Sequence, residues 1–505
     1  MRIGIDVGGT NTDAALIDGD GQVLATVKCP TTEDVTGGVA AALAALGATD
    51  VSAVMIGTTH FVNALVEAAR LEPVAAVRLG LPATAALPPL VDWPLPLREA
   101  VEGAIHLCHG GHEYDGTPLS GLDPAELRAV AADIRARGLR SVAVSSVFSP
   151  VSADSERRAA EILAAELGPG VHLSLSAEIG RVGLLARENA TIVNAALRPL
   201  ADRTVAAFGE ALRRAGITAP LFLSQNDGTL MDVAHARRYP VATFASGPTN
   251  SMRGAAYLSG LSDCAVVDIG GTTTDVGVLA GGFPREAAGE ALVAGVRTNF
   301  RIPDVLSIGI GGGSVVAGDG TTGPRSVGYR LTSEALVFGG PTLTATDLAV
   351  AAGHARLGDP ARVAGVDPGP ALKGIAERVA EAVDRMRTSP APLPVVLVGG
   401  GSILIDELPG FADVRRPDHY EVANAVGAAI AQVGGEVDRV FSGPREANLA
   451  EARAEAVSRA ERAGARAGSV RIVDVEELPL AYLPGDATRI RVKAVGDLDL
   501  EKIDA

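Results

Sequence analysis

Ile3-Gly4-Ile5-Asp6-Val7-Gly8-Gly9-Thr10-Asn11-Thr12-Asp13 opens the chain, and Val266-Val267-Asp268-Ile269-Gly270-Gly271-Thr272-Thr273-Thr274-Asp275 repeats its pattern about half a chain later. Each copy is a short apolar strand that ends in an aspartate, followed by a glycine- and threonine-rich turn and a second strand. Asp6 and Asp268 lie 262 residues apart in a chain of 505 residues. A unit duplicated at half-length predicts two similar lobes that face each other.

The two turns have the composition of a phosphate clamp. Glycine permits positive φ angles and lets backbone N–H groups approach an anion, and threonine and asparagine add side-chain donors. An aspartate would repel phosphate directly, but it can hold Mg²⁺ through the waters of the ion. We therefore predict that Asp6 and Asp268 are catalytic, that they bind Mg²⁺ through water, and that ATP lies between the turns. The residues expected to bind ATP here are Gly8, Gly9, Thr10, Asn11, Thr12, Asp13, Gly270, Gly271, Thr272, Thr273, Thr274 and Asp275.

Two further glycine-rich segments are candidates for the nucleotide site. Val395–Val398 predicts a buried strand that runs into Gly399, Gly400, Gly401 and Ser402, where adenosine could lie against the backbone. The segment 309–314 contains Gly311 and Gly312 and could close over phosphate or substrate. An ordinary glycine-rich turn is the alternative for each segment.

The rest of the chain alternates between strand and helix patterns, which predicts an α/β protein. Together with the duplication, this favours a two-lobed fold with the nucleotide between the lobes. We assign residues 1–250 to an N-terminal lobe with an inserted α/β segment, and residues 251–505 to a C-terminal lobe. Helices are expected over 35–46, 61–69, 124–137, 154–166 and 182–215, the last interrupted or kinked at Pro199, and a hairpin is expected over 104–107 and 114–119.

The amino-acid composition argues against some classes of binding partner. The chain has 44 basic and 60 acidic residues, a net charge of −16, and no basic cluster, which argues against nucleic acid and anionic membranes as partners. Its three cysteines are too few and too scattered for a disulfide framework. The N-terminus has no signal-peptide pattern, and no apolar run is long enough to span a bilayer. A cytoplasmic protein is the expectation.

The chain resembles the hydantoinase/oxoprolinase family, specifically its ATP-binding A-type subunit, within the superfamily of actin-like ATPases, sugar kinases and chaperones. Besides the two phosphate turns, the resemblance rests on motifs in the family's order. They are Gly57-Thr58-Thr59, Asn63-Ala64-Leu65, Asn189 to Asn194, Ser224-Gln225-Asn226-Asp227-Gly228, Ser246-Gly247-Pro248 and Ser307-Ile308-Gly309-Ile310-Gly311-Gly312-Gly313-Ser314. The chain departs from the family where Ile56 precedes Gly57, and where Thr249-Asn250-Ser251 follows Pro248.

The resemblance implies a duplicated ribonuclease-H-like fold and the ATP-dependent opening of a cyclic amide or imide, such as 5-oxoproline or a hydantoin. In such a reaction ATP phosphorylates the amide carbonyl oxygen, and water attacks the activated carbon. The resemblance also implies a B-type partner subunit and leaves a homo-oligomer open. The candidate substrate ligands are Thr58, Thr59, His60, Asn63, Asn189, Gln225, Asn226 and Ser246.

For several candidate site residues, a purely structural role is the alternative to ligand binding. Gln225 and Asn226 could form an Asx turn, and Asn189 could be a satisfied packing contact. His106, Cys108, His109 and His112 form a cluster whose spacing fits no standard zinc pattern, so a solvent-facing hairpin is favoured. Two other functions suit the same fold: a small-molecule kinase, and a regulatory ATPase without amidase activity.

The most specific prediction from the sequence concerns Asp6 and Asp268, the aspartates at the two strand ends. Replacing Asp6 or Asp268 by Asn keeps the shape and removes the charge, so ATP should still bind while turnover falls at least about a hundredfold. Asp18→Asn, in an ordinary turn, is the control. ATP turnover and analogue binding measure both effects, and near-normal turnover in Asp6→Asn and Asp268→Asn would contradict the catalytic assignment.

Overall fold

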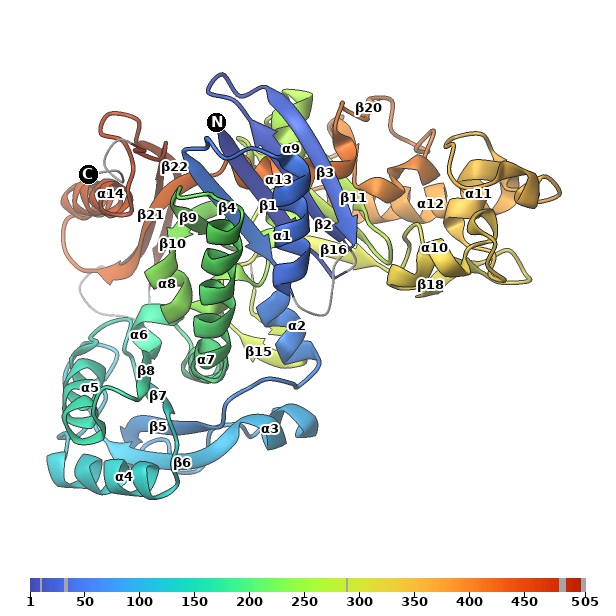
Figure 1. Cartoon of the computed structure of the whole chain (residues 1–505). Helices are drawn as coiled ribbons and strands as arrows, with labels where there is room; N and C mark the ends of the chain where they lie inside the picture. The colour runs from blue at the N-terminus through green and yellow to red at the C-terminus, as the bar shows by residue number, and fades with distance from the viewer. Residues whose placement is uncertain (10, 31–34, 288, 481–486, 501–505) are drawn as a thin grey trace.

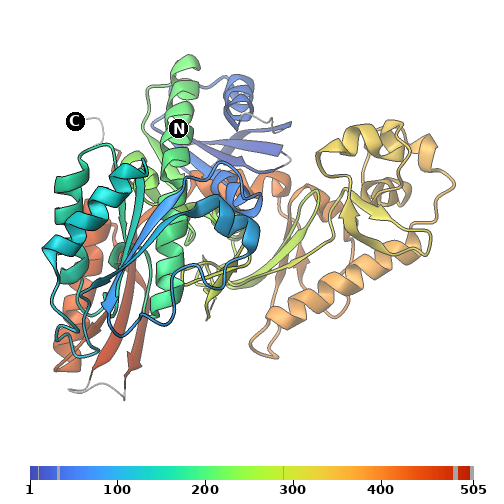
Figure 2. The ribbon, with the colours of Figure 1, turned by 90° about the horizontal axis from the view of Figure 1, so that it is seen from below.

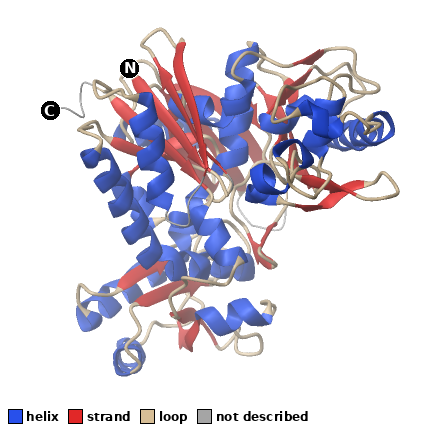
Figure 3. Cartoon of the chain, turned by 45° about the vertical axis from the view of Figure 1, so that its right-hand side comes forward, coloured by secondary structure: helices blue, strands red, loops and turns tan. Residues whose placement is uncertain are grey.

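The computed structural model describes residues 1–9, 11–30, 35–287, 289–480 and 487–500 (Figure 1). Two large sheets stand side by side, and a smaller α/β domain lies below the first of them (Figures 1 and 3). Seen from below, the small domain and the second lobe occupy opposite ends of the molecule (Figure 2).

The first sheet has nine strands in the order β22-β23-β21-β10-β9-β4-β1-β2-β3. Their bounds are β1 Arg2–Val7, β2 Asn11–Ile17, β3 Val23–Pro30, β4 Ala53–Thr58, β9 Leu221–Ser224, β10 Thr229–Asp232, β21 Gln432–Phe441, β22 Arg471–Pro479 and β23 Thr488–Gly496. β1, β2 and β3 are antiparallel neighbours, as the sequence predicted. The register sets Asp6 opposite Asp13 on one side and opposite Gly57 of the parallel strand β4 on the other.

The second sheet repeats this arrangement. Its strands are β11 Cys264–Ile269, β12 Thr274–Ala280, β13 Phe283–Pro284, β16 Val305–Ile308, β19 Val395–Val398 and β20 Val414–Arg415. Asp268 lies opposite Asp275 of antiparallel β12 and opposite Val398 of parallel β19. The duplication inferred from the sequence is therefore confirmed in strand order, direction and register.

The helices and the smaller strands complete the layers. The helices are α1 Val35–Leu46, α2 His60–Val66, α3 Leu95–Val101, α4 Pro124–Ala136, α5 Asp154–Leu167, α6 Ser176–Ile179, α7 Leu184–Arg214, α8 Val233–Arg238, α9 Ser246–Ser259, α10 Leu331–Glu334, α11 Ala345–Ala351, α12 Gly369–Met386, α13 Ala423–Ala429 and α14 Arg445–Arg462. Two ribbons pair β14 Ala291–Val293 with β15 Val296–Thr298, and β17 Ser314–Val316 with β18 Thr322–Ser326. α7 runs through Pro199, which therefore does not end the helix. In the described residues no helix combines the length and apolar character that crossing a bilayer requires.

Neighbouring side chains of the first sheet alternate between two covered faces. Ile3 and Ile5 pack with α1 and the second half of α7. On the opposite face, Ala15 and Ile17 pack against α13. Gly4 lies under α13 so closely that a Cβ atom there would be 2.1 Å from a backbone oxygen of that helix. The first sheet is thus a central layer between helices.

The second sheet alternates in the same way. Val267 packs with α11 and α12, where Ile375 is one of its partners in the buried cluster. The adjacent Val266 faces the other way and packs with Met252 of α9. α9 and α13 therefore form the layer between the two sheets.

α9 and α13 touch through their backbones. A Cβ atom on Gly254 of α9 would lie 1.8 Å from the Ala423 oxygen, and one on Gly427 of α13 would lie 1.9 Å from the Asn250 oxygen. Both distances are far below van der Waals contact, so a larger residue at either position would push the two helices apart. This contact fixes the position of one lobe against the other.

The inserted domain is a parallel sheet in the order β6-β5-β7-β8. Its strands are β5 Val74–Leu81, β6 Glu102–His109, β7 Ser141–Ser146 and β8 His172–Leu175. α4 and α5 cover one face, and α7 covers the other, where Arg78 and Glu188 form a buried ion pair that also includes Ser145. Asp123 caps the N-terminus of α4, since its Oδ1 accepts from Ala125 N at 2.8 Å. The expected hairpin over 104–107 and 114–119 is wrong, because β6 pairs in parallel with β5 and residues 114–119 form no strand.

The C-terminal strands return to the first sheet. β21 pairs in parallel with β10 and antiparallel with β23, which pairs with β22 at the edge. α14 covers these strands through Ala452, Ala456 and Ala460, which pack with Val437 and Val492. The lobes assigned from the sequence divide the chain at residue 250. This division places β21, β22 and β23 in the C-terminal half of the chain, although these strands belong to the first sheet.

Two helical glycines test the contact between the lobes. Gly254→Ala should destabilise the protein by about 1–3 kcal/mol, because its methyl group would overlap the Ala423 backbone. Gly209→Ala, in α7 with open space around the new atom, should be neutral or stabilising by up to about 1 kcal/mol. Thermal unfolding measures both variants, and equal melting temperatures would contradict the close helix contact.

Candidate functional site

The two phosphate turns have the same backbone geometry. Gly8 N donates to Asn11 O at 3.0 Å, and Gly270 N donates to Thr273 O at 2.9 Å. Each turn joins the two strands whose ends carry the paired aspartates. Thr10, predicted to bind ATP, lies outside the described residues.

The aspartates of both lobes crowd together. Burial, followed by the charges of Asp13 and Asp268, raises the pKa of Asp6 from 3.8 to about 7. Burial, followed by the charge of Asp275, raises the pKa of Asp268 to about 6. Asp6 and Asp13 are each only 5% exposed. These carboxylates therefore repel one another in a poorly solvated environment, which favours their protonated forms.

Two interlobe helices supply polar partners to this cluster. Asn424 of α13 donates through Nδ2 to Asp6 Oδ2 at 3.1 Å and to Asp13 Oδ2 at 2.9 Å. Asn250 of α9 donates to Asp6 Oδ1 at 3.5 Å, and the adjacent Ser251 donates to Asp268. Asn250 and Ser251 are thus the residues that depart from the family's usual motif after Ser246-Gly247-Pro248.

Lys28 also contacts the aspartate cluster, although none of the sequence motifs indicated it. It lies on β3, and its Nζ is 2.8 Å from Asp13 Oδ1. Lys28 pairs with a carboxylate from an adjacent strand, and Asn424 reaches the same carboxylate from an alanine-rich helix. Neither residue belongs to a recognisable local pattern, so only the three-dimensional arrangement identifies them.

Both additional glycine-rich segments pack on the second phosphate turn. Gly312 N donates to Gly270 O at 2.9 Å, and a Cβ atom on Gly311 would lie 2.5 Å from Thr272 N. A Cβ atom on Gly401 would lie 2.7 Å from Gly270 O. Glycine is therefore required for these close approaches, and the three segments that the sequence grouped lie together in the structure.

The aspartates themselves lie against glycines in both lobes. A Cβ atom on Gly57 would be 2.5 Å from Asp6 Oδ1, and one on Gly399 would be 2.2 Å from Asp268 Oδ1. By contrast, no described atom lies within 4 Å of a Cβ atom built on Gly9 or Gly400. The site thus combines tightly held carboxylates with open space beside its glycines, as a ligand cradle requires.

Five of the candidate substrate ligands gather beside the first phosphate turn. Ser246 Oγ accepts from Thr58 N and donates to Thr58 O, both at 3.3 Å. Thr59 N donates to Val7 O at 3.4 Å, which joins this segment to the end of β1. Asn63 donates to Thr59 Oγ1 at 3.4 Å, and His60 starts the same helix, α2. These residues therefore lie next to the end of β1, where the first phosphate turn begins.

The other three candidates have their amides engaged in internal contacts. Asn189 accepts from Trp93 Nε1 at 2.8 Å and donates to a backbone oxygen of β15 at 2.9 Å. Asn226 Oδ1 accepts from Ala245 N at 2.8 Å and so positions the start of α9, and Gln225 donates to Thr229. These contacts agree with the structural alternatives, and a substrate role for the three residues stays a prediction.

The histidine and cysteine cluster does not form a metal site in the structure. His106 Nε2 lies 3.3 Å from Asp133, and His109 Nδ1 lies 3.4 Å from Glu126. Cys108 is buried, and burial raises the pKa of its thiol to about 12. Across the described parts of the chain, no three or more His, Cys, Asp or Glu side chains are arranged as direct ligands of one metal ion.

Comparison with known proteins identifies the family. The model of the hydantoinase/oxoprolinase N-terminal region matches residues 2–167, and the hydantoinase/oxoprolinase model matches residues 187–357. This chain belongs to the hydantoinase/oxoprolinase family. The family assignment made from the phosphate turns and their neighbouring motifs is therefore confirmed.

Two curated relatives illustrate the relation. The chain is 28% identical over 474 residues to caprolactamase subunit alpha of Pseudomonas jessenii, a match that covers 85% of this chain and 65% of that subunit. It is 26% identical over 403 residues to the acetophenone carboxylase gamma subunit of Aromatoleum aromaticum, covering 70% of this chain and 53% of that subunit. The matched regions thus span between about half and two thirds of the length of these relatives.

Solved structures confirm the fold. The ATP-dependent caprolactamase from Pseudomonas jessenii superposes with a TM-score of 0.79 at 20% identity, covering 98% of this chain and 87% of that chain. Nucleotide-free acetone carboxylase gives a TM-score of 0.69 at 19% identity, covering 99% of this chain and 88% of that chain. The two-lobed α/β architecture with facing phosphate turns is thus the fold of the hydantoinase/oxoprolinase family.

The crowded aspartates predict a pH-dependent stability. A carboxyl group whose pKa is raised on folding binds more protons in the folded state, so its contribution to stability falls as pH rises from about 4 to about 7. In EDTA and without nucleotide, Asp6→Asn should therefore raise the melting temperature by about 1–3 °C at pH 8 and by less at pH 5.

Asp18→Asn is the matched control for this experiment, because Asp18 lies in a turn away from the other carboxylates. Its melting temperature should follow that of the unchanged protein at both pH values. Thermal melts at pH 5 and pH 8 measure the effect. If the melting temperatures of Asp6→Asn and the unchanged protein differ by the same amount at both pH values, Asp6 titrates normally and the prediction is wrong.

Proposed function

We propose that this protein binds Mg·ATP between its two phosphate turns and opens a cyclic amide or imide after phosphorylating its carbonyl oxygen. The observation that carries the proposal is the pair of strand-end aspartates, one from each lobe: Asp6 is held by side-chain amides of α9 and α13, and Asp268 by the Ser251 hydroxyl of α9. ATP would supply the phosphoryl group, and Mg²⁺ would reach Asp6 and Asp268 through its waters.

The site has the features that such a ligand needs. The first turn is open at Gly9, where no described atom lies within 4 Å of a built Cβ atom, and Gly311 and Gly401 pack closely on the second turn. Asn424 and Lys28 hold the Asp13 carboxylate in place. A carboxylate held on several sides keeps its position as charge moves during phosphoryl transfer, which lowers the reorganisation that the reaction requires.

A carbonyl oxygen as the phosphoryl acceptor is supported by the names of the relatives. Caprolactamase acts on a lactam, and acetone carboxylase and acetophenone carboxylase act on ketones. A lactam and a ketone share a polarised carbonyl group. A poorly electrophilic lactam carbon becomes a target for water once its oxygen carries a phosphoryl group. The tetrahedral adduct would expel the ring nitrogen as the amine, which opens the ring and leaves an acyl phosphate. A second water would then attack the acyl carbon, so that the original lactam oxygen leaves with the phosphate.

The residues beside the first turn would hold the substrate. Thr58, Thr59 and Ser246 are close to the end of β1, and His60 and Asn63 follow on α2. Hydroxyl and amide groups suit a ring that carries both an N–H donor and a carbonyl acceptor. Lobe closure about the α9–α13 contact would exclude bulk water from the transferring group.

A partner subunit completes the proposal. The caprolactamase and carboxylase relatives are themselves named as subunits, and this chain matches only part of their length. We therefore propose that the chain is the ATP-binding A-type subunit and that a B-type subunit takes part in hydrolysis. Activation of a ketone for carboxylation is the second candidate, favoured by the carboxylase relatives.

An isotope experiment tests the chemistry directly. The protein, with and without a B-type subunit, is given Mg·ATP and a lactam or hydantoin whose carbonyl carries ¹⁸O. The proposal expects ¹⁸O in the released inorganic phosphate, because the new P–O bond is kept when the carbon–oxygen bond breaks. Mass spectrometry of the phosphate and of the ring-opened product measures both.

The other outcomes separate the alternatives. A stable phosphoester would identify a small-molecule kinase, and bicarbonate-dependent phosphate release with a ketone would identify a carboxylase. Unlabelled phosphate together with ring opening would contradict carbonyl phosphorylation. ATP binding without any of these reactions would indicate a regulatory ATPase.

A further inference from the structure

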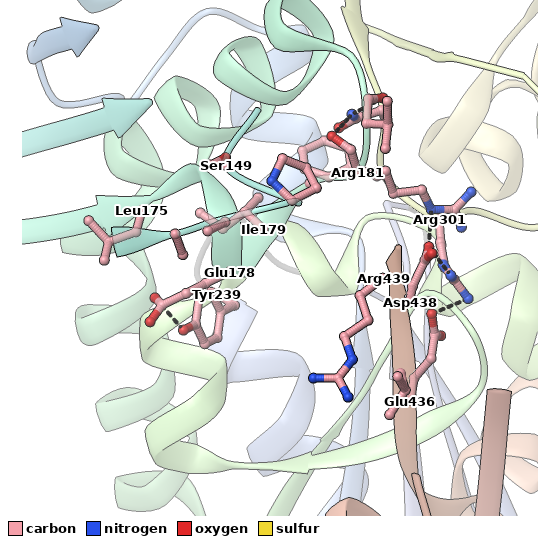
Figure 4. Close-up of a pocket in the computed structure, with 18 of the residues that line it drawn as sticks. Ser149, Leu175, Glu178, Ile179, Arg181, Tyr239, Arg301, Glu436, Asp438 and Arg439 are labelled. Carbon is pink, nitrogen blue, oxygen red and sulfur yellow. Dashed lines mark hydrogen bonds and ion pairs between the residues drawn. The ribbon is translucent and has the colours of Figure 1, made fainter. Parts of the chain in front are cut away.

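A second cavity lies away from the phosphate turns. It has a volume of about 730 Å³ and lies between the inserted domain, the β9–β10 turn and the C-terminal strands β21 and β23. Neither phosphate turn contributes to its lining. Figure 4 shows its two sides, with Leu175, Ile179 and Tyr239 on one and Arg301, Asp438 and Arg439 on the other. A cavity of this size accommodates a small organic molecule.

An arginine-rich ion-pair network forms the charged side. Four arginines share three carboxylates from the segment before β14 and from β21. The arginines are Arg181, Arg301, Arg489 and Arg491, and the carboxylates are Glu286, Glu436 and Asp438. Of the four, Arg491 also reaches two carboxylates of the edge strand β22. Of this network, Arg181, Arg301 and Arg489 line the cavity together with Glu436 and Asp438, so its arginines outnumber its carboxylates on this side of the cavity.

Arg181 is the most weakly held member. Its Nη2 lies 3.4 Å from Glu286, and its Nε lies 3.8 Å from Asp438 and has no hydrogen-bond partner among the residues described. Arg489, in comparison, contacts Asp438 with two nitrogens at 2.7 and 2.6 Å. Burial, together with the charge of Arg301, lowers the pKa of Arg181 to about 10. The guanidinium of Arg181 is therefore held by longer contacts than that of Arg489.

Apolar side chains lie among the polar ones that line the cavity. Leu175, Ile179, Val241 and Phe300 line it, and the Tyr239 hydroxyl is engaged with Glu178 at 2.8 Å. A ligand that satisfies both sides carries an anionic group and an apolar body. A carboxylate suits a guanidinium because its two oxygens match the paired N–H donors.

We propose that this cavity is a binding site for a small organic carboxylate, whose anionic group pairs with Arg181 and whose apolar body packs on Ile179 and Phe300. Arg181 lies between α6 and α7 of the inserted domain, whereas Asp438 belongs to β21 of the first sheet. A bound carboxylate would therefore contact both parts of the protein at once. This site is separate from the nucleotide site and does not depend on the function proposed for that site.

Calorimetry of the full chain tests the site with three defined probes: hexanoate, its neutral analogue hexanamide, and inorganic phosphate. Hexanoate should bind saturably, hexanamide at least about tenfold more weakly, and phosphate more weakly than hexanoate because it lacks an apolar body. Phosphate binding as tight as hexanoate would overturn the carboxylate assignment and indicate a plain anion site. No hexanoate binding at tens of millimolar would overturn the site itself.

Two matched arginine variants locate the binding. Arg181→Gln should weaken hexanoate at least about tenfold, whereas Arg285→Gln should leave it unchanged. Arg285 is a suitable control because its side chain is 26% exposed, against 24% for Arg181, and pairs with Asp304 outside the cavity. Binding of a non-hydrolysable ATP analogue to both variants verifies that they are folded. An unchanged hexanoate affinity in Arg181→Gln, or displacement of hexanoate by the ATP analogue, would overturn the proposal.

If Arg181→Gln does not fold, Ile179→Asn replaces it, because it removes the apolar contact and leaves the ion-pair network intact. Hexanoate should then bind at least about threefold more weakly, with phosphate unaffected. If Ile179→Asn binds hexanoate as tightly as the unchanged protein does, the proposed binding site is wrong.

Discussion

The backbone contact between α9 and α13 determines how the rest of the molecule is arranged. Gly254 and Gly427 let the two helices approach without side chains between them, and each helix covers the inner face of one sheet. Because the helices are this close, Asn250 and Asn424 reach the same carboxylate, Asp6. The geometry of the candidate site therefore follows from a packing constraint several residues away from it.

The aspartate cluster is electrostatically unfavourable in the protein alone. Four carboxylates from two lobes share a poorly solvated volume, and burial with mutual repulsion raises the pKa values of Asp6 and Asp268. Asn250, Ser251 and Asn424 offset part of this cost by donating hydrogen bonds. The remaining cost lowers the stability of the protein, and shifted pKa values of this kind are common at functional sites.

The molecule keeps two kinds of polar site apart. The proposed nucleotide site is built from glycine turns and carboxylates between the lobes, whereas the second cavity beside the inserted domain is lined by arginines, carboxylates and apolar side chains. The wall between them includes the β9–β10 turn, where Asn226 accepts from Ala245 at the start of α9. The β9–β10 turn thus contributes to the lining of the second cavity and also contacts the start of α9.

The sequence by itself determined the family, the duplicated strand–turn–strand units and the glycine segments that pack on the second turn. These features are local: each lies within about ten residues, and its conformation follows from strand-ending aspartates and glycines that only one kind of turn accommodates. The parallel pairing of β6, the return of β21–β23 to the first sheet, and the roles of Lys28 and Asn424 were decided only by the tertiary structure. Those features depend on contacts between residues as much as 418 positions apart, such as Asn424 and Asp6, which no local pattern encodes.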